Sequence, residues 1–200
     1  MNTKEKILST ALDLFNSDGL ENVTTRHISA KLLISQGNLH YHYPTKNVII
    51  NVLFKAFLLE IKVSQKFKDI SFKERIFLNS IKLNYEIMQK YSFIFKDKEI
   101  IWRRLPAIKI ELISFLDAKK LKFVTLLNLY KSNGLLKKDV SNEQINFLAD
   151  QFMFTISSWL LASEFMTTEK NKLTFFVNFT ARLIIPYLEN ETALVWEELI

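Results

Sequence analysis

The residues best suited to molecular recognition lie together at Ser35-Gln36-Gly37-Asn38. Serine, glutamine and asparagine carry short side chains with hydrogen-bonding groups, and a glutamine amide can pair with the N6/N7 edge of adenine. Gly37 leaves room for the backbone to approach another molecule closely. Because serine is a preferred helix N-cap, we expect a helix to begin here, with a polar first turn that could enter the major groove of DNA.

The sequence around this segment predicts the helices that would hold it. Apolar residues recur at helical spacing over residues 3–17, and a short second helix is expected over about 25–31, capped by Thr24 or Thr25. A third helix is expected over residues 35–43. A short helix, a tight turn and a second short helix, braced by a preceding helix, form a helix-turn-helix. The apolar residues placed to fix the angle between the last two helices are Ile28, Leu32, Ile34 and Leu39.

This region resembles the TetR family of transcriptional regulators over about the first fifty residues. The segments that carry the resemblance are Ile7-Leu8, Ala11-Leu12, Leu14-Phe15, Gly19-Leu20, Thr24-Thr25-Arg26, Ile28, Ile34-Ser35, Gly37, Leu39, Tyr41-His42-Tyr43 and Lys46. The resemblance implies a helix-turn-helix DNA-binding domain over residues 1–48. Residues 49–200 would then form a larger helical domain for regulation and dimerisation.

The resemblance also implies which residues contact double-stranded operator DNA. Gln36 matches a base-reading position, and Lys46 matches a phosphate anchor. The full set expected at the DNA is Thr25, Arg26, Ser35, Gln36, Gly37, Asn38, His40, Tyr41 and Lys46. Two residues depart from the family pattern: Leu33 replaces the usual glycine of the turn, and His40 stands where tyrosine is favoured. If Leu33 takes a positive φ, it costs about 1 kcal/mol or more in strain.

Composition limits the class of protein. The 200 residues carry a formal net charge of +6 and include no cysteine, which excludes disulfides and thiolate metal sites. Glycine and proline number only three each, and so few helix breakers predict an all-α chain. The three histidines, His27, His40 and His42, lack the spacing of a metal site, so we expect no metal and no cofactor. No signal peptide or membrane span is visible, and we expect a soluble cytoplasmic protein with no membrane partner.

Two helices expected over about 141–165 and 170–188 are apolar around much of their circumference. By the resemblance, these helices pair with their symmetry mates in a homodimer. A core within one chain is the alternative interpretation. The apolar residues in question are Phe147, Phe154, Leu161 and Phe165 on the first helix, and Phe175, Phe176, Phe179, Leu183 and Ile184 on the second.

Aromatic residues are concentrated in the second domain, where all but one of the 17 phenylalanines lie. The residues that would line the family's ligand pocket are Tyr85, Trp102, Phe123, Phe152 and Trp159. Aromatic residues at helical spacing also fill ordinary cores, so this assignment competes with simple packing. The interpretation that follows is a repressor released from its operator by a small apolar or aromatic molecule. Few charges accompany these aromatic residues, which favours a neutral or weakly polar effector over a strongly anionic one. Arg103 or Arg104 would reverse that preference if either reached the ligand.

Two other interpretations compete with the ligand-responsive repressor. In the first, the same helix-turn-helix is controlled by a protein partner rather than by a small ligand; an enclosed pocket of a few hundred Å3 would favour the small ligand. The second is a helical enzyme. With no cysteine and all histidines in the helix-turn-helix, a nucleophile–histidine pair is unsupported, and we expect no enzymatic activity.

Overall fold

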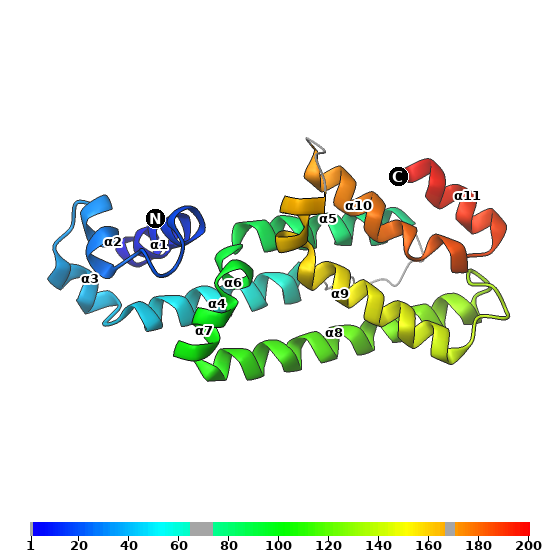
Figure 1. The fold of residues 1–200 in the computed structure, drawn as a ribbon, viewed down its shortest axis with the longest axis horizontal. Helices are drawn as coiled ribbons and strands as arrows, with labels where there is room; N and C mark the ends of the chain where they lie inside the picture. Colours follow the sequence, from blue (N-terminus) through cyan, green and yellow to red (C-terminus); the bar gives the residue numbers. More distant parts are fainter. Residues whose placement is uncertain (1, 65–73, 167–170) are drawn as a thin grey trace. The chain divides into compact units, whose positions relative to one another are not determined.

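The structure is a computed structural model that describes residues 2–64, 74–166 and 171–200. In these ranges the regular elements are helices, which confirms the all-α fold class predicted from the sequence (Figure 1). The chain divides into two compact units. Unit 1 comprises residues 1–63 and 87–111, and unit 2 comprises residues 64–86 and 112–200.

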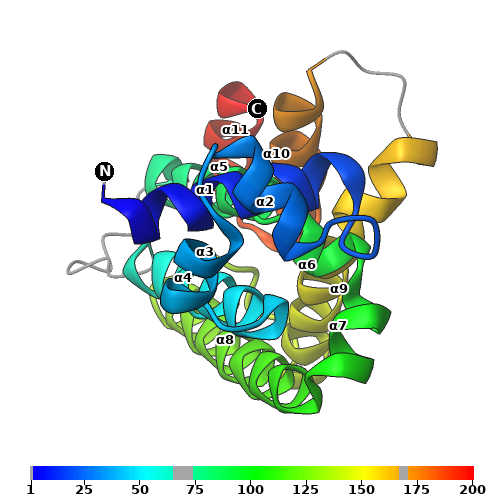
Figure 2. The same ribbon diagram turned by 90° about the vertical axis from the view of Figure 1, so that its left-hand side faces the viewer.

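Unit 1 begins with a helix-turn-helix and its bracing helix. Helix α1 spans Thr3–Asp18, α2 spans Thr25–Lys31 and α3 spans Gln36–His42, close to the three helices predicted from the sequence. Helix α2 packs against both α1 and α3, and Figure 2 faces this end of unit 1. The buried residues of these three helices and their connections include Ile7, Ala11, Phe15, Leu20, Val23, Ile28 and Leu39. Of the four residues predicted to fix the α2–α3 angle, Ile28 and Leu39 are fully buried, whereas Leu32 and Ile34 are half-buried.

The rest of unit 1 supports this module. Helix α4 spans Lys46–Ser64, α6 spans Phe93–Lys96 and α7 spans Lys98–Arg104. Helices α5 (Glu74–Lys90) and α8 (Pro106–Ser132) each contribute residues to both units.

One asparagine ties α1 to the segment between α5 and α6. The Nδ2 of Asn16 donates to the carbonyl of Lys90 at 2.8 Å, and its Oδ1 accepts from the Ser92 hydroxyl and from the Phe93 N–H, each at 3.0 Å. Beside it, the rings of Phe15 and Phe93 lie 5.4 Å apart. Since Asn16 satisfies a backbone carbonyl and a backbone N–H at once, it fixes the position of α1 within unit 1.

Unit 2 has an aromatic core. It contains α9 (Asn142–Met166), α10 (Lys172–Arg182), a 3-10 turn (Ile185–Tyr187) and α11 (Asn190–Leu199), together with parts of α5 and α8. The rings of Phe123 and Phe152 stack 4.2 Å apart, and Phe77 contacts both of them and Trp196. Trp196 is fully buried, so α11 is attached to unit 2 through this side chain.

The sequence-based prediction for the last helix was wrong at its C-terminal end. The helix predicted over 170–188 ends at Arg182 in the structure, and its first residue, Lys170, lies outside the described residues. Pro186 lacks an N–H and cannot continue an α-helix, so the chain forms a 3-10 turn there. Leu136 and Leu188 then pair in an isolated bridge, after which the unpredicted α11 begins.

The turn between α2 and α3 contains an unusual backbone conformation. Leu33 has φ 55°, a left-handed conformation in which leucine is strained, and its side chain is 93% exposed. The Leu33 N–H donates to the Ala30 carbonyl and the Ile34 N–H to the Ser29 carbonyl, so the backbone of the turn is well satisfied. The side chain therefore contributes little packing to offset the strain.

We expect Leu33→Gly to stabilise the protein by about 1 kcal/mol, because glycine adopts positive φ without strain and little packing is lost. Urea denaturation of both proteins measures the difference. Lys31→Gly, at an exposed position within α2, is the control and should destabilise the protein, since glycine there has a low helix propensity. A lower denaturation midpoint for Leu33→Gly would contradict the strain argument.

Candidate nucleic-acid interface

Helices α2 and α3 both begin with side-chain caps that the sequence predicted. The Thr24 hydroxyl accepts from the His27 N–H at 3.3 Å, and His27 Nδ1 accepts from the Thr24 N–H in return. The Ser35 hydroxyl accepts from the Asn38 N–H at 3.1 Å. Each cap satisfies a backbone donor that the helix itself leaves free, so both first turns have a defined geometry.

Gln36 bridges the two helices of the motif. Its Oε1 accepts from the Ser29 hydroxyl at 3.0 Å, and its Nε2 donates to the Thr25 hydroxyl at 2.9 Å. Gln36 is half-buried and Ser29 is buried, so these bonds are partly shielded from water. The side chain predicted to read adenine therefore holds α2 against α3 in this structure.

The remaining predicted base-contacting residues form an exposed polar face. Gly37, Asn38 and His40 on α3 are exposed, as is Arg26 at the start of α2. Tyr41 is 85% exposed, with its ring 5.1 Å from that of His42. In the described part of the chain, the side chains of Arg26, Asn38 and His40 make no hydrogen bond or ion pair. Exposed polar residues on these two capped helices can bind phosphates and base edges.

Lys46 has a structural role that sequence reasoning missed. Its Nζ donates to the carbonyl of Leu20 and lies 5.7 Å from the centroid of the Phe15 ring. Burial and the nearby charge of Arg104 lower the pKa of the Lys46 ammonium. The predicted phosphate anchor thus braces the end of α1 against the start of α4.

The residues predicted to line a ligand pocket fall into three separate groups: Tyr85 and Trp159, which both contact Phe176; Phe123 and Phe152, which stack on each other; and Trp102. Tyr85, Phe123, Phe152 and Trp159 are buried in the core of unit 2, where they pack against other aromatic rings. Trp102 belongs to α7 in unit 1, where the Nζ of Lys109 lies 5.2 Å from its ring centroid.

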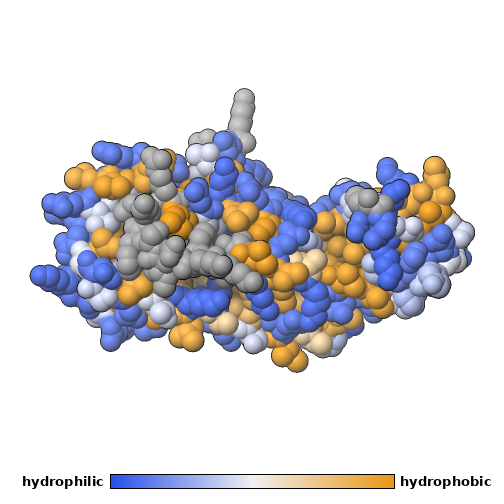
Figure 3. Space-filling model, turned by 180° about the vertical axis from the view of Figure 1, so that it is seen from behind, coloured by the Kyte–Doolittle hydropathy of each residue, from blue (hydrophilic) through white to orange (hydrophobic). Residues whose placement is uncertain are grey.

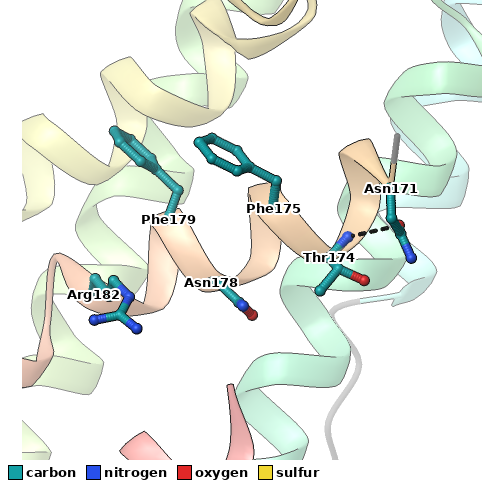
Figure 4. Close-up of a pocket in the computed structure, with 6 residues that line it drawn as sticks. All are labelled: Asn171, Thr174, Phe175, Asn178, Phe179 and Arg182. Carbon is teal, nitrogen blue, oxygen red and sulfur yellow. Dashed lines mark hydrogen bonds between the residues drawn. The ribbon is translucent and has the colours of Figure 1, made fainter. Parts of the chain in front are cut away.

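The structure contains a groove of about 410 Å3 along α10, outside the predicted set. Phe175 and Phe179 project from one side of the helix and Asn178 from the other (Figure 4). The residues that line the groove are Asn171, Thr174, Phe175, Asn178, Phe179 and Arg182. It is a shallow surface feature of a single helix, and so it does not decide between a small ligand and a protein partner.

Other kinds of site find no support in the ranges that the structure covers. Among these residues, no group of three or more metal-ligating side chains comes together. None of the helices described has the length and apolar character needed to cross a membrane.

Comparison with protein families gives two matches that together span most of the chain. Residues 7–53 match the model described as bacterial regulatory proteins of the tetR family. Residues 60–193 match the model described as a bacterial transcriptional repressor, TetR. The chain belongs to the TetR family. TetR-family proteins are DNA-binding transcriptional regulators rather than enzymes, and they typically act as homodimers on operator DNA.

Individual proteins resemble this chain over different shares of its length. The class E tetracycline repressor of Escherichia coli is 39% identical over 54 residues, which are 27% of this chain and 26% of the relative. The chain therefore matches only about a quarter of the length of this curated relative. A TetR-family regulator from Marinobacter aquaeolei superposes with a TM-score of 0.86 at 24% identity, over 100% of this chain and 97% of the other. A regulator from Saccharomonospora viridis, solved in complex with choline, has a TM-score of 0.65 at 16% identity, over 94% and 98%.

We expect Gln36→Ala and Asn38→Ala to separate structural from DNA-reading roles. Gln36→Ala removes both bonds between α2 and α3 and should lower the free energy of unfolding by about 1 kcal/mol. Asn38→Ala removes an exposed side chain without an internal partner, so stability should stay unchanged while affinity for the preferred duplex falls by about 1–3 kcal/mol. Denaturation and fluorescence-anisotropy titration measure the two effects. Equal stability losses in both variants would contradict the assignment.

Proposed function

We propose that this TetR-family protein is a repressor that binds a palindromic operator as a homodimer in the cytoplasm, through residues 1–48. The observation that carries the proposal is the exposed polar face of α3. Gln36 holds this helix against α2 through its bonds to Ser29 and Thr25. Asn38 and the backbone at Gly37 would contact base edges, whereas Arg26, His40 and Tyr41 would bind phosphate or base. Thr25 and Ser35, at the start of their helices, would approach phosphates where helix dipoles favour anions.

An apolar face of α9 and α10 supports a homodimer. Phe147, Phe154 and Phe165 are exposed along one side of α9, and Leu161 lies between them. Phe179 adds to this face from α10. An exposed row of large apolar side chains fits a self-complementary interface with a two-fold axis. By contrast, Phe176 and Ile184, which the sequence placed among the pairing residues, are fully buried within unit 2.

The space-filling view shows that apolar patches also occur elsewhere, separated by hydrophilic side chains (Figure 3). Leu121 on α8 and Leu194 on α11 are examples of exposed apolar residues in unit 2. Single exposed residues of this kind are normal for a soluble domain. The α9–α10 face differs because its apolar residues on α9 are spaced about one or two helical turns apart. They therefore lie along the same side of that helix.

Residues 49–200 would form the effector-binding and dimerisation domain. The curated relatives are named tetracycline repressors, and one structural neighbour was solved in complex with choline, so small ligands occur among related proteins. A small apolar or aromatic effector that binds unit 2 would lower operator affinity if it prefers the non-binding state. Regulation by a protein partner is the alternative, and the open groove along α10 does not decide between the two.

We expect selection from random duplexes to enrich a palindrome with two half-sites. Arg26→Ala should weaken binding to all sequences and reduce the slope of log affinity against log salt by about one, because one phosphate contact is lost. The control is Lys122→Ala, an exposed lysine on α8 in unit 2, which should leave the slope unchanged. If no motif is enriched, the operator-binding proposal fails.

We expect Phe154→Glu to convert the dimer into a monomer, since it places a charge in the middle of the proposed apolar interface. Phe154 is 73% exposed in the single chain, so the substitution should leave the fold intact. Leu121→Glu, which alters an exposed apolar residue on α8, is the matched control and should remain dimeric. Light scattering at micromolar concentration measures the mass. A wild-type protein that is monomeric under these conditions would contradict the interface.

A further inference from the structure

A lysine occupies the core-facing side of α8. Leu112, Phe123 and Leu127 are buried along one side of this helix, and Lys119 falls on the same side, seven residues after Leu112 and four before Phe123. Long charged side chains at such positions usually extend to the surface. Lys119 is half-buried, and its ammonium turns toward Asn84 on α5, within unit 2.

Among the residues that the structure describes, the ammonium of Lys119 bonds to one partner and meets no counter-charge. Its Nζ donates to the Oδ1 of Asn84 at 2.9 Å, and Asn84 is itself buried, with its Nδ2 donating to the carbonyl of Ser80. Within the described ranges, no carboxylate pairs with Lys119. The neighbouring Lys120 differs, because it forms an ion pair with Asp150. An ammonium has three protons to donate, so an amide oxygen alone leaves it poorly compensated. Accordingly, burial lowers the pKa of Lys119 to about 8.

Aromatic rings and unsatisfied polar atoms lie in the same unit. Tyr85, which follows Asn84 on α5, packs its ring 5.2 Å from that of Phe176, and Trp159 contacts Phe176 from α9 at 5.1 Å. The indole Nε1 of Trp159 and the hydroxyl of Thr180 are buried and find no hydrogen-bond partner among the residues described. Buried polar atoms are normally satisfied, so each unsatisfied one in a native core needs an explanation.

We propose that unit 2 binds a small apolar molecule that carries a carboxylate, with Lys119 and Asn84 at the carboxylate and the rings of Tyr85, Trp159 and Phe176 against the apolar body. The proposal rests on the proposed function of this unit as the effector domain, and it replaces a neutral effector with an acidic one. A carboxylate supplies the missing counter-charge and accepts hydrogen bonds from both the ammonium and the Asn84 amide. The aromatic rings must separate to admit the ligand, whose own surface then replaces their mutual contacts.

The first test needs no ligand. We expect Lys119→Met to raise the melting temperature of the ligand-free protein by several degrees, because methionine fills the same space without an uncompensated charge. The control is Lys120→Met, which removes the lysine paired with Asp150 and should leave the melting temperature nearly unchanged. A fall of several degrees in Lys119→Met would show that Lys119 is a structural part of the core and would overturn the proposal.

The second test compares acids with their own amides on the wild-type protein. The probes are 2-naphthylacetate, 4-phenylbutyrate and decanoate, each paired with the corresponding primary amide, and calorimetry measures their affinities. We expect at least one acid to bind at least about tenfold more tightly than its amide. That preference should disappear in Lys119→Met and persist in Lys120→Met. If no acid binds more tightly than its amide, the proposal is overturned.

The failure of this inference is distinguishable from that of the proposed function. An amide that binds as tightly as its acid and lowers operator affinity would leave the ligand-responsive repressor standing and refute the acidic site. An acid that binds through Lys119 without changing operator affinity would support the acidic site and refute the ligand-responsive repressor. Operator affinity is measured in the same titrations by fluorescence anisotropy, with the duplex obtained from the random selection.

Discussion

The geometry of unit 1 depends on how the backbone is satisfied where α1 ends. Leu20 is fully buried, so its N–H and C=O need partners inside the protein. Two charged side chains supply them: Asp97 accepts from the N–H at 2.8 Å, and Lys46 donates to the carbonyl. Because Asp97 precedes α7 and Lys46 begins α4, these bonds join three parts of the chain at one residue. With the bonds of Asn16, they hold the helix-turn-helix in place within unit 1.

The hydrogen bonds around Leu20 and Asn16 hold the helix-turn-helix in place, so the strained turn at Leu33 and the bridging side chain of Gln36 can lie beside an exposed recognition surface. Leu33 keeps a left-handed conformation because the surrounding backbone bonds determine the turn. Gln36 fixes α3 against α2, which leaves Asn38, His40 and Tyr41 to present their side chains outward. Sequence recognition would then depend on a surface whose position is set before DNA arrives, so little ordering cost accompanies binding.

The sequence predicted local structure well because caps and breakers act locally. Thr24 and Ser35 both cap their helices as their residue types indicate. Long-range contacts were not predictable in this way. Nothing in the sequence near Lys46 reveals that its amine reaches Leu20. Local patterns also do not separate buried Phe176 from exposed Phe179, because that distinction depends on what covers each side of α10. Helix α11 was missed because Pro186 suggested an end rather than a turn between two helices.

We propose that a pair of α2–α3 modules reads successive turns of one duplex. Hydroxyl-radical footprinting on the duplex enriched by selection tests this arrangement. We expect two symmetric regions of backbone protection about one helical turn apart, or a multiple of it, flanking major-groove half-sites of the palindrome. Protection of a single region without two-fold symmetry, or protection confined to the minor groove, would contradict it.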